Sequence, residues 1–295
     1  MLNEVHVKSV LNKTKRRDAW FLDDYTVNPY SACSFNCLYC YVRGSKYGIN
    51  MAEKISVKIN AIDVLEKQLK SRANKKQYGF VVFSSATDPY LQLEKDLLLS
   101  RRILELFLKY RFPVHIITKS DLVLRDLEII CEINKTAILP EDLKPQIGAG
   151  ALITFSFSTL DERIAHIFEP GAPAPSRRLQ ALAAFKKAGL RAGVSLMPLL
   201  PYITDTGANL EQMYSVFSKV GPDYVMAASV SLFGNSPSDS KNLVLRAVSK
   251  HFPELEGKYG RIFSKNSSVP SHYHAALLKK TNELCAKYNL KSRII

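Results

Sequence analysis

Three cysteines, Cys33, Cys37 and Cys40, stand close together in a C-x₃-C-x₂-C arrangement. Thiolates are the usual ligands of iron–sulfur clusters, and a [4Fe–4S] cluster offers four irons to be ligated. Three neighbouring thiolates therefore leave one iron open to a small molecule. The spacing predicts a cluster that can take part in chemistry, because one coordination position stays free.

Two other interpretations of the cysteines remain open. A structural zinc site needs a fourth ligand, and no second C-x₂-C pair or H-x₃₋₅-H pair follows nearby. The thiols can also be unrelated core residues. A disulfide framework is disfavoured, because the chain has 5 cysteines and its 295 residues can form a core without covalent links.

The composition favours a cytoplasmic globular protein. Hydrophobic residues make up 46% of the chain, and no run of about 18 apolar residues that would span a membrane is present. The N-terminal residues Met-Leu-Asn-Glu-Val-His are too polar for a signal peptide. We therefore expect reduced thiols and no membrane partner.

The charge of the chain makes nucleic acid a candidate partner. The sequence has 41 Lys and Arg against 27 Asp and Glu, a formal net charge of +14. A basic protein binds polyanions by releasing their counterions. The basic residues are nevertheless spread along the chain in short groups, as on an ordinary solvated surface.

Apolar runs of strand length alternate with amphipathic segments of helix length, which is typical of a parallel sheet covered by helices. The expected helices are 62–71, 96–110, 122–131, 176–188, 210–220 and a last one at 271–288, with Leu97, Leu98, Ile103, Leu104 and Phe107 as the buried face of the second. The expected strands are 25–30, 80–84, 114–118, 152–157, 192–197 and 224–228.

Six such units predict a partial (β/α)₆ barrel of the TIM type. We expect an N-terminal extension at 1–24, a core at 25–230, and a loop-rich and helical C-terminal extension at 231–295 that covers the open side. Residues 134–150 are expected to form a surface loop.

Polar residues gather where the expected strands end, which is where parallel barrels hold their ligands. The cysteines follow the first strand, and the second is followed by Ser84-Ser-Ala-Thr-Asp-Pro-Tyr90. The third ends at Lys119, which can pair with a carboxylate. Ser156 lies in the fourth, and Ser195 and Met197 end the fifth, in an apolar stretch that suits the face of a purine.

The cysteine run, with an aromatic residue before its last cysteine, resembles the cluster motif of the radical S-adenosylmethionine (radical SAM) superfamily. Over residues 25–230 the chain further resembles the spore photoproduct lyase-like group, often labelled DNA repair photolyases. The segments that carry this resemblance are Asn28-Pro-Tyr30, Thr87-Asp-Pro-Tyr90, Ile117-Thr-Lys-Ser120, Val123-Leu-Arg-Asp-Leu127, Phe155-Ser-Phe-Ser-Thr-Leu-Asp161 and Phe168 to Leu179.

The resemblance implies two cofactors, a [4Fe–4S] cluster and S-adenosylmethionine, and an electron donor such as flavodoxin or ferredoxin. By match to the lyase, Thr87, Lys119 and Ser156 contact S-adenosylmethionine, with Tyr39 beside them. It implies an enzyme that reductively cleaves S-adenosylmethionine to a 5′-deoxyadenosyl radical. Glu169 and Arg178 belong to a shared segment whose role the sequence does not give.

One departure from the lyase bears on the substrate. The lyase has a hydrogen-donating cysteine three residues before the Asp of its second-strand motif, and this chain has Ser85 there. An O–H bond is harder to break homolytically than an S–H bond, so lyase activity is not expected; Tyr90, Cys131 and Cys285 are the remaining candidate donors. The alternatives to a radical SAM enzyme are a non-catalytic iron–sulfur electron-transfer protein and a zinc-stabilised nucleic-acid-binding module.

Overall fold

The computed structural model describes residues 3–45 and 55–295. A seven-stranded sheet forms its centre, and six of its strands are parallel. An antiparallel strand, β2 (Leu11–Lys13), pairs with the first of them at one edge. In chain order the parallel strands are β3 (Tyr25–Val27), β6 (Val81–Phe83), β7 (Val114–Thr118), β8 (Ala151–Ser156), β9 (Arg191–Leu199) and β10 (Val225–Ser229), and they lie side by side in that order.

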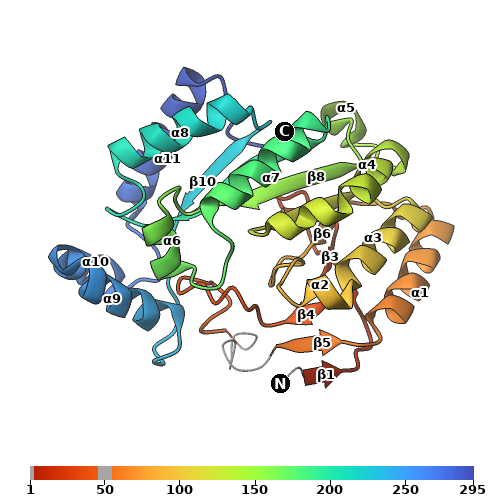
Figure 1. Ribbon diagram of the computed structural model, residues 1–295, viewed down its shortest axis with the longest axis horizontal. Helices are drawn as coiled ribbons and strands as arrows, with labels where there is room; N and C mark the ends of the chain where they lie inside the picture. Colours follow the sequence, from red (N-terminus) through yellow and green to blue (C-terminus); the bar gives the residue numbers. More distant parts are fainter. Residues whose placement is uncertain (1–2, 46–54) are drawn as a thin grey trace.

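Helices cover one face of this sheet in an arc (Figure 1). They are α1 (Ala61–Asn74), α2 (Glu94–Leu97), α3 (Leu99–Tyr110), the 3₁₀ helix η1 (Asp121–Asp126), α4 (Leu127–Thr136), α5 (Lys144–Ile147), α6 (Glu162–Phe168), α7 (Pro175–Lys187) and α8 (Gly207–Val220). The edge strands β2 and β10 do not pair with each other. The fold is therefore an open α/β sheet of six strand–helix units, as predicted, and not a closed barrel.

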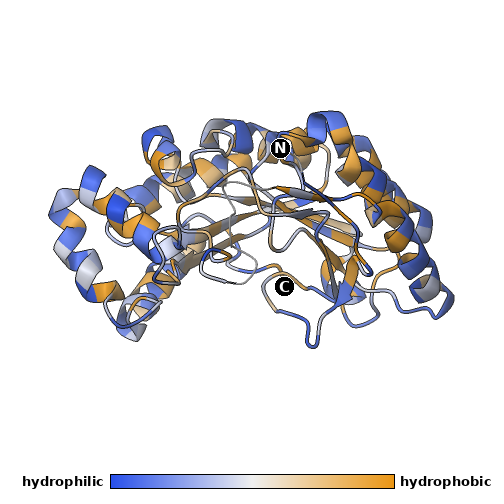
Figure 2. Ribbon diagram, turned by 90° about the horizontal axis from the view of Figure 1, so that it is seen from below, coloured by the Kyte–Doolittle hydropathy of each residue, from blue (hydrophilic) through white to orange (hydrophobic). Residues whose placement is uncertain are grey.

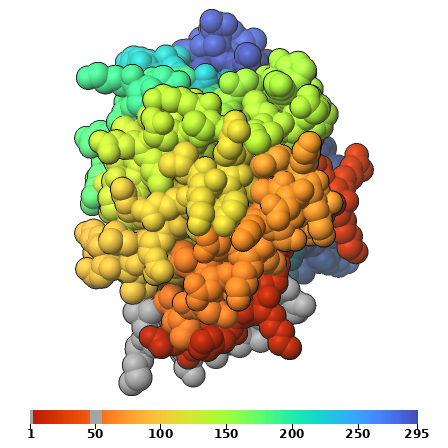
Figure 3. All heavy atoms as spheres, turned by 90° about the vertical axis from the view of Figure 1, so that its right-hand side faces the viewer, coloured from red at the N-terminus to blue at the C-terminus, as the bar shows by residue number. Residues whose placement is uncertain are grey.

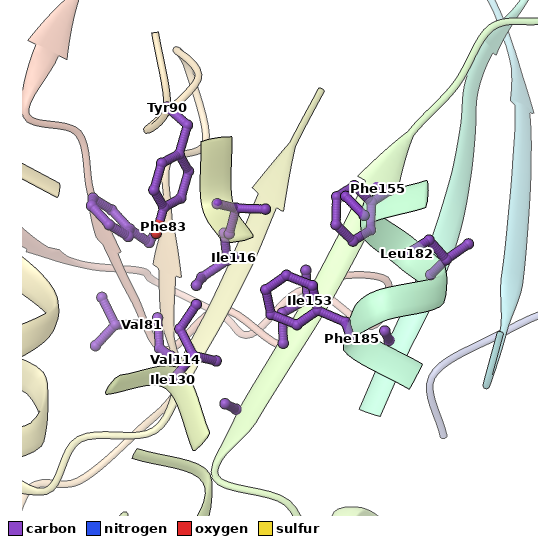
Figure 4. Close-up of a cluster of buried hydrophobic side chains, with 14 of the residues drawn as sticks. Val81, Phe83, Tyr90, Val114, Ile116, Ile130, Ile153, Phe155, Leu182 and Phe185 are labelled. Carbon is purple, nitrogen blue, oxygen red and sulfur yellow. The ribbon is translucent and has the colours of Figure 1, made fainter. Parts of the chain in front are cut away.

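The helices carry apolar residues on their inner sides and hydrophilic residues outside (Figure 2). In α3, Ile103 and Phe107 are spaced by one turn and both are fully buried. Figure 4 shows the cluster that fills the space between strands and helices, including Phe83 on β6, Ile116 on β7 and Phe155 on β8. Helices α1 and α3 pack side by side on the face seen in Figure 3.

Alternation along β8 explains where the polar residues go. Ile153 and Phe155 point toward the helices, so Leu152, Thr154 and Ser156 must point to the opposite, inner face. Leu152 joins a second apolar cluster that includes Leu22 of the N-terminal segment. The inner face is thus apolar near the amino ends of the strands and polar toward their carboxyl ends.

A series of buried polar groups lies between the apolar part and the polar part of the inner face. His115 on β7 contacts the Phe21 carbonyl at 2.7 Å and the Thr154 hydroxyl at 2.6 Å. The Thr154 hydroxyl lies 2.7 Å from that of Tyr224. Burial lowers the pKa of His115 to about 4. A neutral imidazole therefore links the N-terminal segment to the inner face of the sheet.

The small elements outside the main sheet were not predicted. The expected first strand, 25–30, ends at Val27, and Tyr30 lies in β4 (Tyr30–Ser31). This strand joins a three-stranded sheet with β5 (Ser56–Lys58) and β1 (Asn3–Val5). Strands this short carry too few residues to show an alternating pattern.

Three further expectations were wrong in part. Residues 134–150 contain the end of α4 and the short α5 as well as loop. Leu97 and Leu98 are 39% and 40% exposed, because Leu98 takes a left-handed conformation that separates α2 from α3. The expected helix 122–131 starts as the 3₁₀ helix η1 and becomes α-helical only at Leu127.

The C-terminal extension is more helical than expected. It contains α9 (Ser240–His251), η2 (Pro253–Leu255), α10 (Glu256–Phe263) and α11 (Ser271–Lys287). Helix α11 packs against β10 and α8, at the edge of the sheet. No helix of the described residues is long and apolar enough to cross a membrane. The expected division into three regions stays a prediction.

Candidate active site

A cavity of about 470 Å³ opens at the carboxyl ends of the parallel strands. It is lined by residues from the cysteine loop and from the ends of β6, β7, β8, β9 and β10. All residues that the sequence singled out as metal or cofactor contacts line it: Cys33, Cys37, Cys40, Tyr39, Thr87, Lys119, Ser156, Ser195 and Met197. The fold thus brings together side chains that lie up to 164 residues apart, from Cys33 to Met197.

Three hydroxyls at this cavity lack partners. Ser84 Oγ, Thr87 Oγ1 and Ser229 Oγ are buried and form no hydrogen bond with the described residues. A buried hydroxyl without a partner costs about 1–3 kcal/mol. Because they line the cavity, these hydroxyls are suited to bind a polar ligand. Ser229 was missed by the sequence analysis, which examined only the first five strand ends for ligand contacts.

Asp88 joins two of the strand ends. Its carboxylate accepts hydrogen bonds from the Tyr90 and Lys119 amides at 2.9 and 2.7 Å, and from the Thr118 hydroxyl at 2.8 Å. Burial raises the pKa of Asp88, while these donors oppose the rise. Asp88 therefore holds the loop after β6 against the end of β7 and sets where Thr87 and Lys119 stand.

The Lys119 ammonium faces the cavity beside the cysteine loop. Its nitrogen lies 5.9 Å from the centre of the Tyr39 ring. It forms no ion pair with a carboxylate of the described residues, in contrast to Lys186, which pairs with Asp223 at 2.6 Å. An unpaired ammonium on the wall of a cavity is suited to bind a carboxylate ligand.

The three cysteines are free thiols with different surroundings. Burial raises the pKa of Cys33 to about 12, and the Asp88 charge adds to the rise. Burial also raises the pKa of Cys37, although Lys119 opposes it. Within residues 3–45 and 55–295, no three His, Cys, Asp or Glu side chains are grouped as for a metal ion. A four-iron cluster is wider than an ion, and its thiolates bind different irons.

The side chain of Tyr39, between the last two cysteines, is held in place by buried polar groups. Its hydroxyl donates to Glu169, which also accepts from the Ser158 hydroxyl at 2.9 Å. Glu169 Oε2 faces the Arg178 guanidinium at 2.5 Å. Burial acts to raise the pKa of Glu169, but Arg178 and then Lys119 outweigh it and hold the pKa below its ordinary value. Glu169 and Arg178, whose role could not be derived from the sequence, are thus tied to the cysteine loop.

Arg178 extends this connection to the sheet. It donates to the Pro173 carbonyl at 2.8 Å and to the Ser156 carbonyl, at the end of β8, at 3.1 Å. The cysteine loop and the end of β8 are therefore held by one buried chain of polar contacts. No sequence signal paired Glu169 with Tyr39, because 130 residues separate them.

The candidate hydrogen donors lie elsewhere. Tyr90, Cys131 and Cys285 do not line the cavity. Tyr90 is 1% exposed beneath Arg125, whose guanidinium lies 5.8 Å from its ring centre. Ser85 does line the cavity; its hydroxyl accepts from Asn28 at 3.2 Å and its carbonyl accepts from the Tyr41 hydroxyl.

Residues 27–213 match the profile of the radical SAM superfamily. The chain belongs to this superfamily. The expected family is thus confirmed, and so are the superfamily's cofactors, a [4Fe–4S] cluster and S-adenosylmethionine. The donor set fits them: three thiols, unpartnered hydroxyls and an unpaired ammonium share one cavity.

Sequence relatives of this radical SAM protein come from bacteria, archaea and viruses. An uncharacterized protein of Mycobacterium tuberculosis is 28% identical over 98% of the chain and 81% of its own length. One of Methanocaldococcus jannaschii is 30% identical over 68% of the chain and 69% of its own length. The radical SAM Nα-GlyT isomerase of Pseudomonas phage M6 is 21% identical over 84% of the chain and 47% of its own length.

Solved structures with the same fold include spore photoproduct lyase. One variant of it, with bound AdoMet and dinucleoside spore photoproduct, superposes with a TM-score of 0.65 at 15% identity, covering 97% of this chain and 79% of the lyase. SuiB of Streptococcus suis bound to S-adenosylmethionine gives 0.53 at 13% identity, covering 90% of this chain and 48% of SuiB. At these identities the likeness establishes the fold.

Proposed function

We propose that this radical SAM enzyme binds its cluster through Cys33, Cys37 and Cys40 and cleaves S-adenosylmethionine to form a radical that acts on a nucleic-acid component. The observation that carries the first part is the shared cavity, where three thiols face unpartnered hydroxyls and a free ammonium. When bound, the cluster supplies the electron that breaks a carbon–sulfur bond of S-adenosylmethionine.

The residues of the chain bind and orient in this proposal. Lys119 pairs with the ligand carboxylate, and the hydroxyls of Thr87 and Ser156 bind its polar groups. Ser195 and Met197, on the inner face of β9, lie against the adenine. Tyr39, fixed by Glu169, keeps the cysteine loop beside Lys119. An external donor of the flavodoxin or ferredoxin class supplies the electrons.

The cavity favours an enzyme over the two alternatives. An electron-transfer protein does not need a ligand cavity of about 470 Å³ with unpartnered hydroxyls. A zinc-stabilised module needs a fourth ligand beside the cysteines. The decisive experiment is anaerobic reconstitution with iron and sulfide, followed by metal analysis and detection of 5′-deoxyadenosine after reduction with dithionite. Zinc without iron would contradict the proposal.

The nucleic-acid substrate rests on charge and on relatives. The chain carries a net charge of +14, and the lyase with the same fold binds a dinucleoside photoproduct. Binding of labelled single-stranded and duplex DNA should weaken steeply between about 50 and 200 mM salt, with a logarithmic slope of about −0.9 per neutralised duplex phosphate and −0.7 for single strands. Absent or salt-insensitive binding would instead favour a small-molecule or peptide substrate.

A further inference from the structure

A buried arginine lies directly behind the cysteine loop. Arg43, three residues after Cys40, is only 4% exposed. Its guanidinium donates to the Cys37 carbonyl at 3.1 Å and to the Asn36 side chain, both inside the loop. It also donates to the Ser238 carbonyl at 3.2 Å, in the C-terminal extension. The arginine thus ties the loop to a segment from the other end of the chain.

No acidic side chain in the described part of the chain pairs with the charge of Arg43. Its three acceptors are two carbonyls and an amide, and no carboxylate in the described part of the chain forms an ion pair with it. A buried charge is unfavourable unless an opposite charge lies near. The other deeply buried arginine at this site, Arg178, follows that rule through Glu169. Within residues 3–45 and 55–295, no side chain supplies the negative charge that would balance Arg43.

Close packing fixes Arg43 in this place. A Cβ added to Gly44 would lie 3.0 Å from the Phe233 backbone, and one added to Gly234 would lie 2.1 Å from the Asp239 carboxylate. The turn of residues 233–239 is held by its own hydrogen bonds, including one that the Ser236 amide donates to the Asp239 carboxylate at 2.7 Å. The arginine therefore lies beneath a closely packed turn, to which its guanidinium is also hydrogen-bonded at Ser238.

We propose that Arg43 is the charge partner of the iron–sulfur cluster and sets its reduction potential. This inference rests on the proposed cluster site at the three cysteines. A cluster with three thiolates carries net negative charge, which increases when it takes up an electron. A fixed cation behind Cys37 stabilises the reduced form more than the oxidised one, and so raises the potential.

The test compares Arg43→Gln and Arg43→Lys with the parent protein after anaerobic reconstitution. The measured quantities are the iron content and the midpoint potential of the cluster. The potential is monitored by EPR in the absence of any substrate. Arg43→Gln should shift the potential to more negative values, and Arg43→Lys, which keeps the charge, should shift it less. Arg191→Gln is the matched control, because Arg191 likewise donates to neutral acceptors, in its case three backbone carbonyls, but lies at the start of β9.

The possible results distinguish the charge role of Arg43 from the presence of the cluster site. A normal potential in Arg43→Gln with full iron content would overturn the inference and leave the cluster site intact. If Arg43→Gln retains no iron, the Lys variant decides: iron retention with a near-parental potential supports the charge role, and loss of iron from both variants overturns it. A parent protein that takes up no iron would contradict the cluster site itself.

Discussion

Glu169 Oε2 and the Arg178 guanidinium form an ion pair at 2.5 Å, and the two side chains are 0% and 1% exposed. The pair connects Tyr39 of the cysteine loop with the carbonyl of Ser156 at the end of β8. Apart from this contact, neither of the paired atoms has a hydrogen-bond partner in the described structure. Each charge therefore depends on the other.

Breaking this pair should destabilise the protein strongly. Glu169→Gln and Arg178→Met each leave one buried charge, and we expect a loss of about 3–5 kcal/mol in the free energy of unfolding. The double variant should lose clearly less than the sum, because it leaves no unpaired charge. Urea unfolding of the cluster-free protein measures all three. Strictly additive losses in the free energy of unfolding would show that the two charges do not depend on each other.

Replacing any cluster cysteine should abolish iron binding. Cys33→Ala, Cys37→Ala and Cys40→Ala each remove one of three thiolates, so we expect loss of the absorption band near 400 nm and of 5′-deoxyadenosine formation. Cys131→Ser is the control, because Cys131 lies on α4 and does not line the cavity. Full iron content in a variant at Cys33, Cys37 or Cys40 would show that another ligand is used.

Removing the Lys119 charge should weaken S-adenosylmethionine binding. A hydrogen bond to a charged group is worth about 1.5–3 kcal/mol, which corresponds to a dissociation constant raised by about 10- to 150-fold in Lys119→Met. Equilibrium dialysis with reconstituted protein gives this constant. Lys187→Met, at an exposed position near the end of α7, removes the same charge away from the cavity. Equal effects of the two changes would exclude a direct contact.

Much of the cavity lining could be predicted from the sequence, because each strand is a continuous apolar run and a polar residue follows at its end. Lys119 and Ser156 were found in this way, whereas Cys33, Cys37 and Cys40 were found by their spacing. The partners of Arg43 and Glu169 could not be found, because a buried charge shows its acceptor only when distant segments meet. Helices α9 and α10 were missed for a local reason: the segments Gly234-Asn-Ser-Pro237 and Tyr259 to Ser268, rich in glycine, serine and asparagine, suggested loop.

Acid should weaken the protein through His115. Its pKa is about 4 in the folded state against an ordinary 6.5, so the unfolded chain binds more protons between these pH values. The free energy of unfolding should therefore fall as pH falls from 6.5 to about 4, by about 3 kcal/mol in total. In His115→Asn this part of the pH dependence should disappear. An unchanged slope in the variant would assign the acid sensitivity to other groups.

Spore photoproduct should not be repaired efficiently by this protein. Ser85 stands where the lyase has its cysteine, and Tyr90, Cys131 and Cys285 do not line the cavity. We expect reduced protein to form 5′-deoxyadenosine with little thymine release from photoproduct-containing DNA. Ser85→Cys, which adds a thiol to the cavity wall, should increase repair. Repair over many turnovers by the parent protein would identify another donor.

The bond from Arg43 to the Ser238 carbonyl spans 195 residues. During synthesis on the ribosome it cannot form until almost the whole chain has been made. The cysteines emerge early, so for most of translation their loop exists without the turn to which Arg43 later ties it. A cluster delivered to the growing chain would therefore meet a loop that is not yet held in place, whereas one delivered to the finished protein would enter through the cavity that the cysteines line.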